Sequence, residues 1–366
     1  MQNQLPVLIF AQSARFIAES ATHAGYTVWV ADCFCDTDTL AVAERSLKIP
    51  PLSGLSEVEF FSALQTLSQG APCALILGTG IESLYPLLNK LPDHIRYLGN
   101  TIQTLSLLRQ AQLFFNLLDT LKLPYPEVSF SQPLSPDSNW LYKDLSGYGG
   151  QTIQATQQAV KTSNGYYQAF VNGQAASVCF LADGQQAIPL SFNEQQNLSE
   201  QFQLLQIYTP FEIPPQIKQG LVQALNEITQ ASGLKGLASL DFIIDNDVFY
   251  ILEINPRFTA SAELTRFQSA LFQWHLQALH GELVSKHTIW TDKPRLLTYY
   301  YAEQDCVICA QPHWPKTCHD LPAAATPIAK HHPVCTIIVE AETRVDCEKA
   351  LQTQRLLVQQ NLLADS

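Results

Sequence analysis

The most constraining feature of the sequence is a pair of alternating apolar runs that flank a polar turn between Leu240 and Asn255. Alternation of this kind is typical of β-strands with one buried face, and two such runs separated by a short turn predict an antiparallel hairpin. Because successive side chains point to opposite faces of a strand, the length of the turn decides which polar groups meet. The turn length therefore determines what chemistry this hairpin can support.

Two turn lengths fit the polar residues between the runs. A two-residue turn, Asn246-Asp247, places Asp241 opposite Leu252 and away from Glu253. A three-residue turn, residues 245–247, instead places Asp241 and Glu253 on one face and gives an uninterrupted apolar face opposite. The apolar pattern therefore predicts the three-residue turn. Its apolar face would consist of Leu240, Phe242, Ile244, Val248, Tyr250, Leu252 and Ile254.

The predicted register gathers three oxygen-bearing side chains at one end of the hairpin, namely Asp241, Glu253 and Asn255. Mg²⁺ prefers oxygen ligands and often takes its remaining ligands from substrate phosphates. Neighbouring carboxylates repel each other unless a cation lies between them. The pattern predicts a magnesium site, with Mn²⁺ as an alternative ion, and Arg257 just beyond it can contact a phosphate or a carboxylate. The simpler alternative is an exposed hairpin with scattered acids.

The first hundred residues predict a different architecture. Short apolar runs at residues 5–10, 27–32 and 74–77 read as buried strands, and residues 14–24 as a helix. Strands that alternate with helices predict a doubly wound parallel sheet. The turn at residues 11–14 lacks G-x-G-x-x-G, which argues against a Rossmann-type dehydrogenase. Gly78-Thr79-Gly80 follows a strand at the edge where such sheets bind ligands, although a plain tight turn explains it equally well.

The remainder of the 366 residues predicts one or two further domains. A short strand at residues 140–143 ends in Lys143 and precedes a glycine-bearing loop, residues 146–150. Two strands joined at Asn172-Gly173 and a later strand at 298–310 follow from the same kind of pattern. Apolar periodicity predicts helices at residues 105–121, 214–232, 262–280 and 345–363.

Charge and hydropathy exclude several classes of partner. The net charge is −12 and no Lys/Arg cluster is present, so we expect neither nucleic acid nor an anionic membrane surface as a partner. No apolar stretch is long enough for a signal peptide or a membrane span. Nine cysteines in such a chain are expected to be free thiols in a reducing compartment, which predicts a cytoplasmic protein.

Cysteines and histidines gather in the C-terminal third. Cys306 and Cys309 have C-x-x-C spacing, and Cys318-His319 and His331-His332 follow. Zinc is one interpretation of this pattern. The residues between the first two cysteines, however, are apolar and lie in a predicted strand, without the glycine that usually turns such a pair toward a metal. We therefore expect thiols that bind no metal.

The hairpin resembles the metal-binding signature of the ATP-grasp superfamily of carboxylate–amine ligases, in the runs 241–244 and 252–257. This resemblance implies that Asp241, Glu253 and Asn255 hold Mg²⁺ on the phosphates of ATP. It also implies that Arg257 touches phosphate or an acyl-phosphate intermediate.

Other landmarks of the family fall in the same order along the chain. Lys143 matches the phosphate-binding lysine, and Gly147, Gly149 and Gly150 match the loop that closes over the phosphates. Gln168, Ala169, Phe170 and Val171 match the segment whose backbone meets adenine. Gly99-Asn100 matches the joint that precedes these elements. The resemblance implies three parts: a Rossmann-like domain at 1–100, a small ATP-grasp lobe at 101–165, and a large lobe with a C-terminal extension at 166–366.

Two departures from the family pattern leave alternatives open. Ala111 occupies the place of an additional lysine, which Arg109 can replace only in part. Neutral residues bracket the adenine segment where acidic ones are common. The leading hypothesis is an ATP-dependent ligase that joins a small carboxylate, amino-acid-like or a cofactor precursor, to an amine. The alternative is a nucleotide-binding relative without turnover that acts as a sensor or assembly subunit. The sequence leaves the oligomeric state open, a homodimer included.

Overall fold

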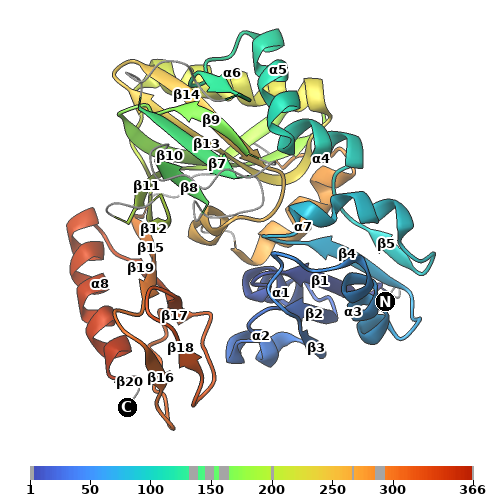
Figure 1. Ribbon diagram of the computed structural model, residues 1–366, viewed down its shortest axis with the longest axis vertical. Helices are drawn as coiled ribbons and strands as arrows, with labels where there is room; N and C mark the ends of the chain where they lie inside the picture. The colour runs from blue at the N-terminus through green and yellow to red at the C-terminus, as the bar shows by residue number, and fades with distance from the viewer. Residues whose placement is uncertain are drawn as a thin grey trace.

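The computed structural model describes residues 4–131, 139–144, 152–155, 165–198, 202–265, 268–284 and 293–364. A parallel sheet lies at the N-terminal end, and antiparallel sheets follow it along the chain (Figure 1). The predicted combination of a doubly wound parallel sheet with a later α+β region is confirmed. The predicted domain bounds at residues 100 and 165 stay a prediction.

The parallel sheet has the strand order β3-β2-β1-β4-β5. Strand β1 is buried on both faces: Leu8 and Phe10 pack toward Phe60 of α3, while Val7 and Ile9 pack in a second cluster with residues of α1 and α7. Apolar side chains at every position therefore fit a strand that is covered on both sides. The elements are β1 (Val7–Ala11), α1 (Arg15–His23), β2 (Val28–Asp32), α2 (Thr37–Val42), β3 (Arg45–Lys48), α3 (Glu57–Ser68), β4 (Cys73–Leu77), the 3₁₀ helix η1 (Glu82–Lys90) and β5 (Ile95–Tyr97).

The helix predicted at residues 105–121 is two helices, α4 (Ile102–Arg109) and α5 (Ala111–Leu121). Gln110 between them is extended, with φ −83° and ψ 114°. The apolar period continues across the break, so the pattern could not reveal it. A four-stranded antiparallel sheet of order β6-β9-β7-β8 follows. Its strands are β6 (Val128–Ser129), β7 (Trp140–Asp144), β8 (Ile153–Ala155) and β9 (Gly165–Ala169).

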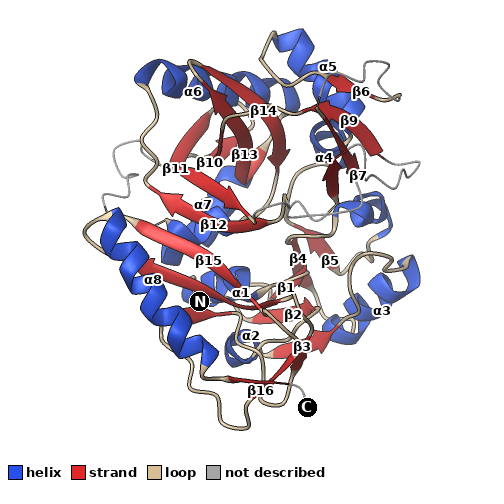
Figure 2. Cartoon of the chain, turned by 60° about the vertical axis from the view of Figure 1, so that its left-hand side comes forward, coloured by secondary structure: helices blue, strands red, loops and turns tan. Residues whose placement is uncertain are grey.

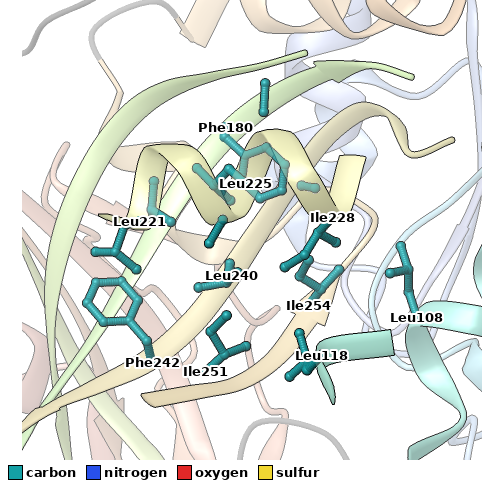
Figure 3. Packing of buried hydrophobic residues seen from close by; sticks show 14 of the residues in the cluster. Leu108, Leu118, Phe180, Leu221, Leu225, Ile228, Leu240, Phe242, Ile251 and Ile254 are labelled. Atoms are coloured by element: carbon teal, nitrogen blue, oxygen red, sulfur yellow. The ribbon is translucent and has the colours of Figure 1, made fainter. Parts of the chain in front are cut away.

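An eight-stranded antiparallel sheet of order β14-β13-β10-β11-β12-β15-β19-β17 carries the hairpin at its edge. Leu221, Leu225 and Ile228 of α6 pack on Leu240 and Phe242 of β13 (Figure 3). This contact buries one face of the hairpin and fixes which side chains are left on the other. The elements are β10 (Gln174–Asp183), β11 (Ala187–Asn197), β12 (Leu204–Thr209), α6 (Pro215–Ser232), β13 (Lys235–Asp245), β14 (Val248–Asn255), β15 (Arg295–Tyr301), β17 (Cys318–His319) and β19 (Pro333–Glu340).

The helix predicted at residues 262–280 is replaced by the 3₁₀ helix η2 (Ala260–Leu264) and α7 (Gln268–Leu279). The strand predicted at 298–310 is also two strands, β15 and β16 (Cys306–Ile308), with polar residues 303–305 between them. The last part of the chain adds β18 (Pro327–Ile328), α8 (Arg344–Gln359) and β20 (Leu362–Ala364). Helix α8 lies beside β15 and β19 (Figure 2).

The cysteines are free thiols, as expected. Among the described residues, Cys306 and Cys309 belong to no group with the spacing of a metal site. Of the helices the structure describes, none combines the length and apolar character that crossing a membrane requires.

Candidate functional site

The hairpin β13–β14 pairs Asp241 with Glu253, but not through the predicted turn. The turn has two residues, and Asn246 at its start has φ +51°, a conformation that asparagine tolerates better than most residues. A β-bulge then adds Leu252 to β14, so that Phe242 pairs with Ile251 and Asp241 with Glu253. The prediction that the two carboxylates share a face is confirmed, and the predicted three-residue turn is wrong.

The bulge also changes which residues of β14 face the core. Before it, Ile251 is fully buried, whereas Val248, expected on the apolar face, is 42% exposed. After it, Ile254 returns to the core beside Leu240. Sequence alternation alone could not show this shift, because residues 248–252 are all apolar and fit either phase of the alternation.

The two paired carboxyl groups lie close enough for their charges to interact. Burial and the charge of Glu253 raise the pKa of Asp241 well above its usual range. Burial also opposes ionisation of Glu253, but the charges of Arg109 and Lys143 outweigh it and lower the pKa of that carboxyl group. Two carboxyl groups this close repel each other when both are ionised, and a divalent cation between them would relieve that repulsion.

Asn255, on the same strand as Glu253, contacts both carboxyl groups. Its amide nitrogen Nδ2 lies 3.3 Å from Asp241 Oδ2 and 3.2 Å from Glu253 Oε1. Its amide oxygen Oδ1, the predicted metal ligand, accepts from Arg109 Nη1 and Arg257 Nη2, each at 3.1 Å. The structure thus brings all three predicted metal residues together, and it directs the oxygen of Asn255 toward two guanidinium groups.

Arg257 connects the hairpin to the carboxyl edge of the parallel sheet. Its Nε donates to Glu82 Oε1 at 3.0 Å, and its Nη1 donates to Thr79 Oγ1 at 3.1 Å and to the carbonyl of Phe258. Thr79 belongs to the glycine turn that the sequence marked as a possible ligand-binding edge. The side chain of Arg257 is 9% exposed. It therefore holds the two sheets together at the site.

Glu82, at the start of η1, was missed by the sequence reasoning. Its carboxylate lies 3.0 Å from Arg257 and 4.0 Å from Arg109. Burial opposes its ionisation, but these two guanidinium groups lower the pKa of Glu82. The only signal in the sequence was its position just after Gly78-Thr79-Gly80. No local pattern relates Glu82 to two arginines far along the chain.

Lys143 lies in β7, opposite Ile153 of β8 and Tyr166 of β9. Burial lowers the pKa of Lys143, and the nearby charges of Glu253 and Asp241 oppose that shift. The predicted phosphate-binding lysine is thus brought to the paired carboxylates. The glycines predicted to close over phosphate, Gly147, Gly149 and Gly150, lie outside the described residues.

The predicted adenine segment runs from β9 into the connection to β10. The backbone N–H groups of Ala169 and Phe170 donate to the carbonyls of Glu127 and Asn139. Gln168 is 2% exposed, and among the described residues its amide nitrogen Nε2 has no partner. Val171 is half-buried. A buried donor without a partner is costly and indicates a place where a ligand can accept a hydrogen bond.

The predicted joint, Gly99-Asn100, precedes α4. The side chain of Asn100 accepts from the backbone N–H of Lys235 at 2.7 Å and donates to its carbonyl at 2.9 Å. These bonds attach the start of α4 to the first residue of β13. Arg109, at the far end of α4, is thereby held beside the hairpin.

Comparison with known proteins gives a consistent result. Residues 112–261 match the model of an ATP-grasp domain. The chain is 24% identical over 222 residues to tyramine–L-glutamate ligase of Methanocaldococcus jannaschii, across 59% of this chain and 66% of the ligase's own length.

Two solved structures share the fold. Biotin carboxylase from Campylobacter jejuni superposes with a TM-score of 0.75 at 14% identity, covering 98% of this chain and 92% of that one. The L-amino acid ligase from Bacillus licheniformis superposes with a TM-score of 0.73 at 15% identity, and the match covers 100% of each chain.

Proposed function

This chain carries an ATP-grasp domain, and we propose that it is an ADP-forming carbon–nitrogen ligase. In this reaction the γ-phosphoryl group of ATP is transferred to a substrate carboxylate, giving an acyl phosphate and ADP. An amine then attacks the acyl carbon, and an amide forms as inorganic phosphate leaves. An amino-acid-like or cofactor-precursor carboxylate is the proposed substrate class, in line with relatives named as ligases of L-glutamate and of L-amino acids.

The observation that carries the proposal is the cross-strand pair Asp241 and Glu253, with Asn255 in contact with both carboxyl groups and Lys143 near their charges. Oxygen ligands of this kind fit Mg²⁺, with Mn²⁺ as a close substitute, and Asp241 and Glu253 would hold the ion. The bound metal would neutralise charge that develops on the transferred phosphoryl group. The amide oxygen of Asn255, the third predicted ligand, could reach a metal only after releasing Arg109 and Arg257.

The chain's own residues supply the remaining functions. Lys143 would place its ammonium group on a phosphate oxygen. Arg257 makes four donor contacts to the protein, and its fifth N–H, on Nη2, has no partner among the described residues and would be available to the acyl phosphate. Gln168 would donate its unpaired amide N–H to the base of the nucleotide.

The test is release of ADP and phosphate from Mg·ATP in the presence of a panel of amino acids and amines. The proposal expects release that needs both a carboxylate and an amine, together with formation of the corresponding amide. Persistent absence of turnover with every pair, alongside measurable ATP binding, would overturn it.

A nucleotide-binding protein without turnover is the second candidate, and one observation favours it. Ala111, at the place where the family has an additional lysine, begins α5 and is 7% exposed, so this position offers phosphate neither a cation nor an open donor. The same assay separates the two candidates. Binding of ATP with no product from any substrate pair would support the sensor or assembly role.

A further inference from the structure

The guanidinium group of Arg109 lies against the end of β14, beside Glu253 and Asn255. Its Nη1 is 3.0 Å from the carbonyl oxygen of Ile254, 3.1 Å from Asn255 Oδ1 and 3.4 Å from Glu253 Oε2. The other carboxylate oxygen, Glu253 Oε1, faces the amide nitrogen of Asn255. Asn255 Nδ2 therefore lies near both Glu253 Oε1 and Asp241 Oδ2, while Glu253 Oε2 is paired with Arg109.

Three oxygen-bearing side chains of this kind could hold two cations. One would lie between Asp241 and Glu253, and the other between Glu253 and the amide oxygen of Asn255. The second of these positions is where Arg109 Nη1 sits, because it contacts both of the oxygens that would define it. A divalent ion there would meet the fixed positive charge of a guanidinium group at close range.

The amide of Asn255 cannot simply turn over to release its oxygen. In its present orientation the oxygen accepts from two guanidinium groups and the nitrogen lies beside two carboxyl groups. A flip would place the NH₂ group against Arg109 and Arg257, and the oxygen against Asp241 and Glu253. The first exchange would set donor against donor, and the second would set acceptor against acceptor.

The position of Arg109 is also fixed by the helix that carries it. It is the last residue of α4, where the helix dipole favours a positive charge. Leu105 and Leu108 of the same helix are buried, and Thr104 donates to the carbonyl of Ser232 at 2.8 Å. The Arg109 side chain is 18% exposed, against 47% for Glu253. The guanidinium group is therefore a fixed part of the site.

We propose that Arg109 occupies the place of a second divalent cation, so that the site binds one cation per nucleotide, on Asp241 and Glu253. This inference rests on the proposed function, since it concerns the same nucleotide site. It assigns Arg109 a positioning role: it supplies positive charge beside Glu253 and keeps Asn255 turned toward the carboxyl pair.

The test counts Mn²⁺ bound to the full-length protein with a saturating non-hydrolysable ATP analogue, by equilibrium dialysis and electron paramagnetic resonance. We expect one Mn²⁺ in the wild type and two in Arg109→Gln, with a dipolar coupling between the two ions in the variant. Arg96→Gln, the same substitution at an exposed arginine, is the matched control and should bind one. Two Mn²⁺ in the wild type, or one in a folded Arg109→Gln, would overturn the proposal.

Two further measurements distinguish failure of this inference from misfolding of the variant and from failure of the proposed function. If Arg109→Gln does not fold, as judged by near-UV circular dichroism, the wild-type count still decides, and Arg109→Lys provides a second variant. That variant keeps the charge and is expected to bind one Mn²⁺, so two would contradict a charge-based exclusion. No nucleotide-dependent Mn²⁺ in the folded wild type would instead overturn the proposed function, and this inference with it.

Discussion

Two clusters of charged side chains in this molecule differ in their balance. The hairpin cluster contains the acids Glu82, Asp241 and Glu253 and the cations Arg109, Lys143 and Arg257. The Arg15 cluster sets one guanidinium group against four acids, namely Glu19, Asp38, Glu263 and Asp320. The Arg15 cluster is the more enclosed, since Arg15 is 2% exposed and Glu253 47%, but only the hairpin cluster has as many cations as acids.

The ratio of cations to acids has different consequences in the two clusters. In the hairpin cluster, three cations can receive the additional negative charge of phosphates. In the Arg15 cluster, acids exceed cations and burial adds a further cost, so some acids must keep their protons. Burial raises the pKa of Glu263 to about 7, although Arg15 opposes the shift. The contrast indicates ligand binding in the first cluster, whereas the excess of acids in the second makes stability depend on pH there as well as at Asp241.

The largest expected effect is on the hairpin cluster. Glu253→Gln removes a carboxylate from the proposed metal site and should lower ligase turnover by about 10³-fold or more, because the charge that holds the cation is lost. Steady-state ADP release measures it. Asp247→Asn, in the exposed turn of the same hairpin, is the control and should leave turnover unchanged. Equal turnover in wild type and Glu253→Gln would remove the distinction between the clusters.

The next effect is on stability. Arg15→Gln leaves four acids without their shared cation and should lower the free energy of unfolding by about 3 kcal/mol, the lower end for a broken buried ion pair because the acids can take up protons. Urea denaturation at pH 8 measures it. Arg45→Gln, at a half-buried arginine of strand β3, provides the comparison. An unchanged midpoint would show that the Arg15 cluster contributes nothing to stability.

The third prediction concerns pH. Asp36 lies near Asp320, Asp32, Asp38 and Arg15, and burial together with the first two acids raises its pKa to about 8. The folded state then binds a proton that the unfolded state releases near pH 4, so the free energy of unfolding falls as pH rises from about 4 to 8.

Between pH 6 and 8 this loss should amount to about 2 kcal/mol for one such group. Denaturation across that range measures it, and Asp36→Asn should flatten the dependence while Glu57→Gln, at an exposed acid, should not. A free energy of unfolding that rises with pH over this range would contradict the charge imbalance.

The smallest effect is at the nucleotide end of the site. Gln168→Leu removes the buried amide that has no protein partner and should weaken binding of a non-hydrolysable ATP analogue about 10-fold, the value of roughly one hydrogen bond. Calorimetric titration measures the dissociation constant. Gln174→Leu, at an exposed glutamine beyond the same segment, should bind as the wild type does. Equal weakening in both variants would remove Gln168 from the site.

The sequence was sufficient for the elements that local pattern controls. The parallel sheet followed from apolar runs that alternate with a helix, and the shared face of Asp241 and Glu253 from alternation in the hairpin. The turn was nevertheless wrong, because a shorter turn combined with a bulge at Leu252 puts the two carboxylates on that same face. A pattern can therefore predict which side chains meet while missing the backbone route that brings them together.

Local sequence patterns could not predict the charged clusters. Arg15 and Asp320 are 305 residues apart, and Glu82 and Arg257 are 175 apart. The break at Gln110 that ends α4 at Arg109 leaves the apolar period intact. Such contacts depend on how whole sheets pack, and no spacing in the sequence encodes them.

The central claim is that the carboxyl pair of the hairpin holds a cation on the phosphates of ATP. A crystal structure with Mg²⁺ and a non-hydrolysable ATP analogue tests it most directly. The account predicts Mg²⁺ bound by Asp241 and Glu253 and bridging phosphate oxygens near Lys143, with the base beside residues 168–171. A bound nucleotide whose phosphates lie elsewhere, with no cation at Asp241 and Glu253, would contradict it.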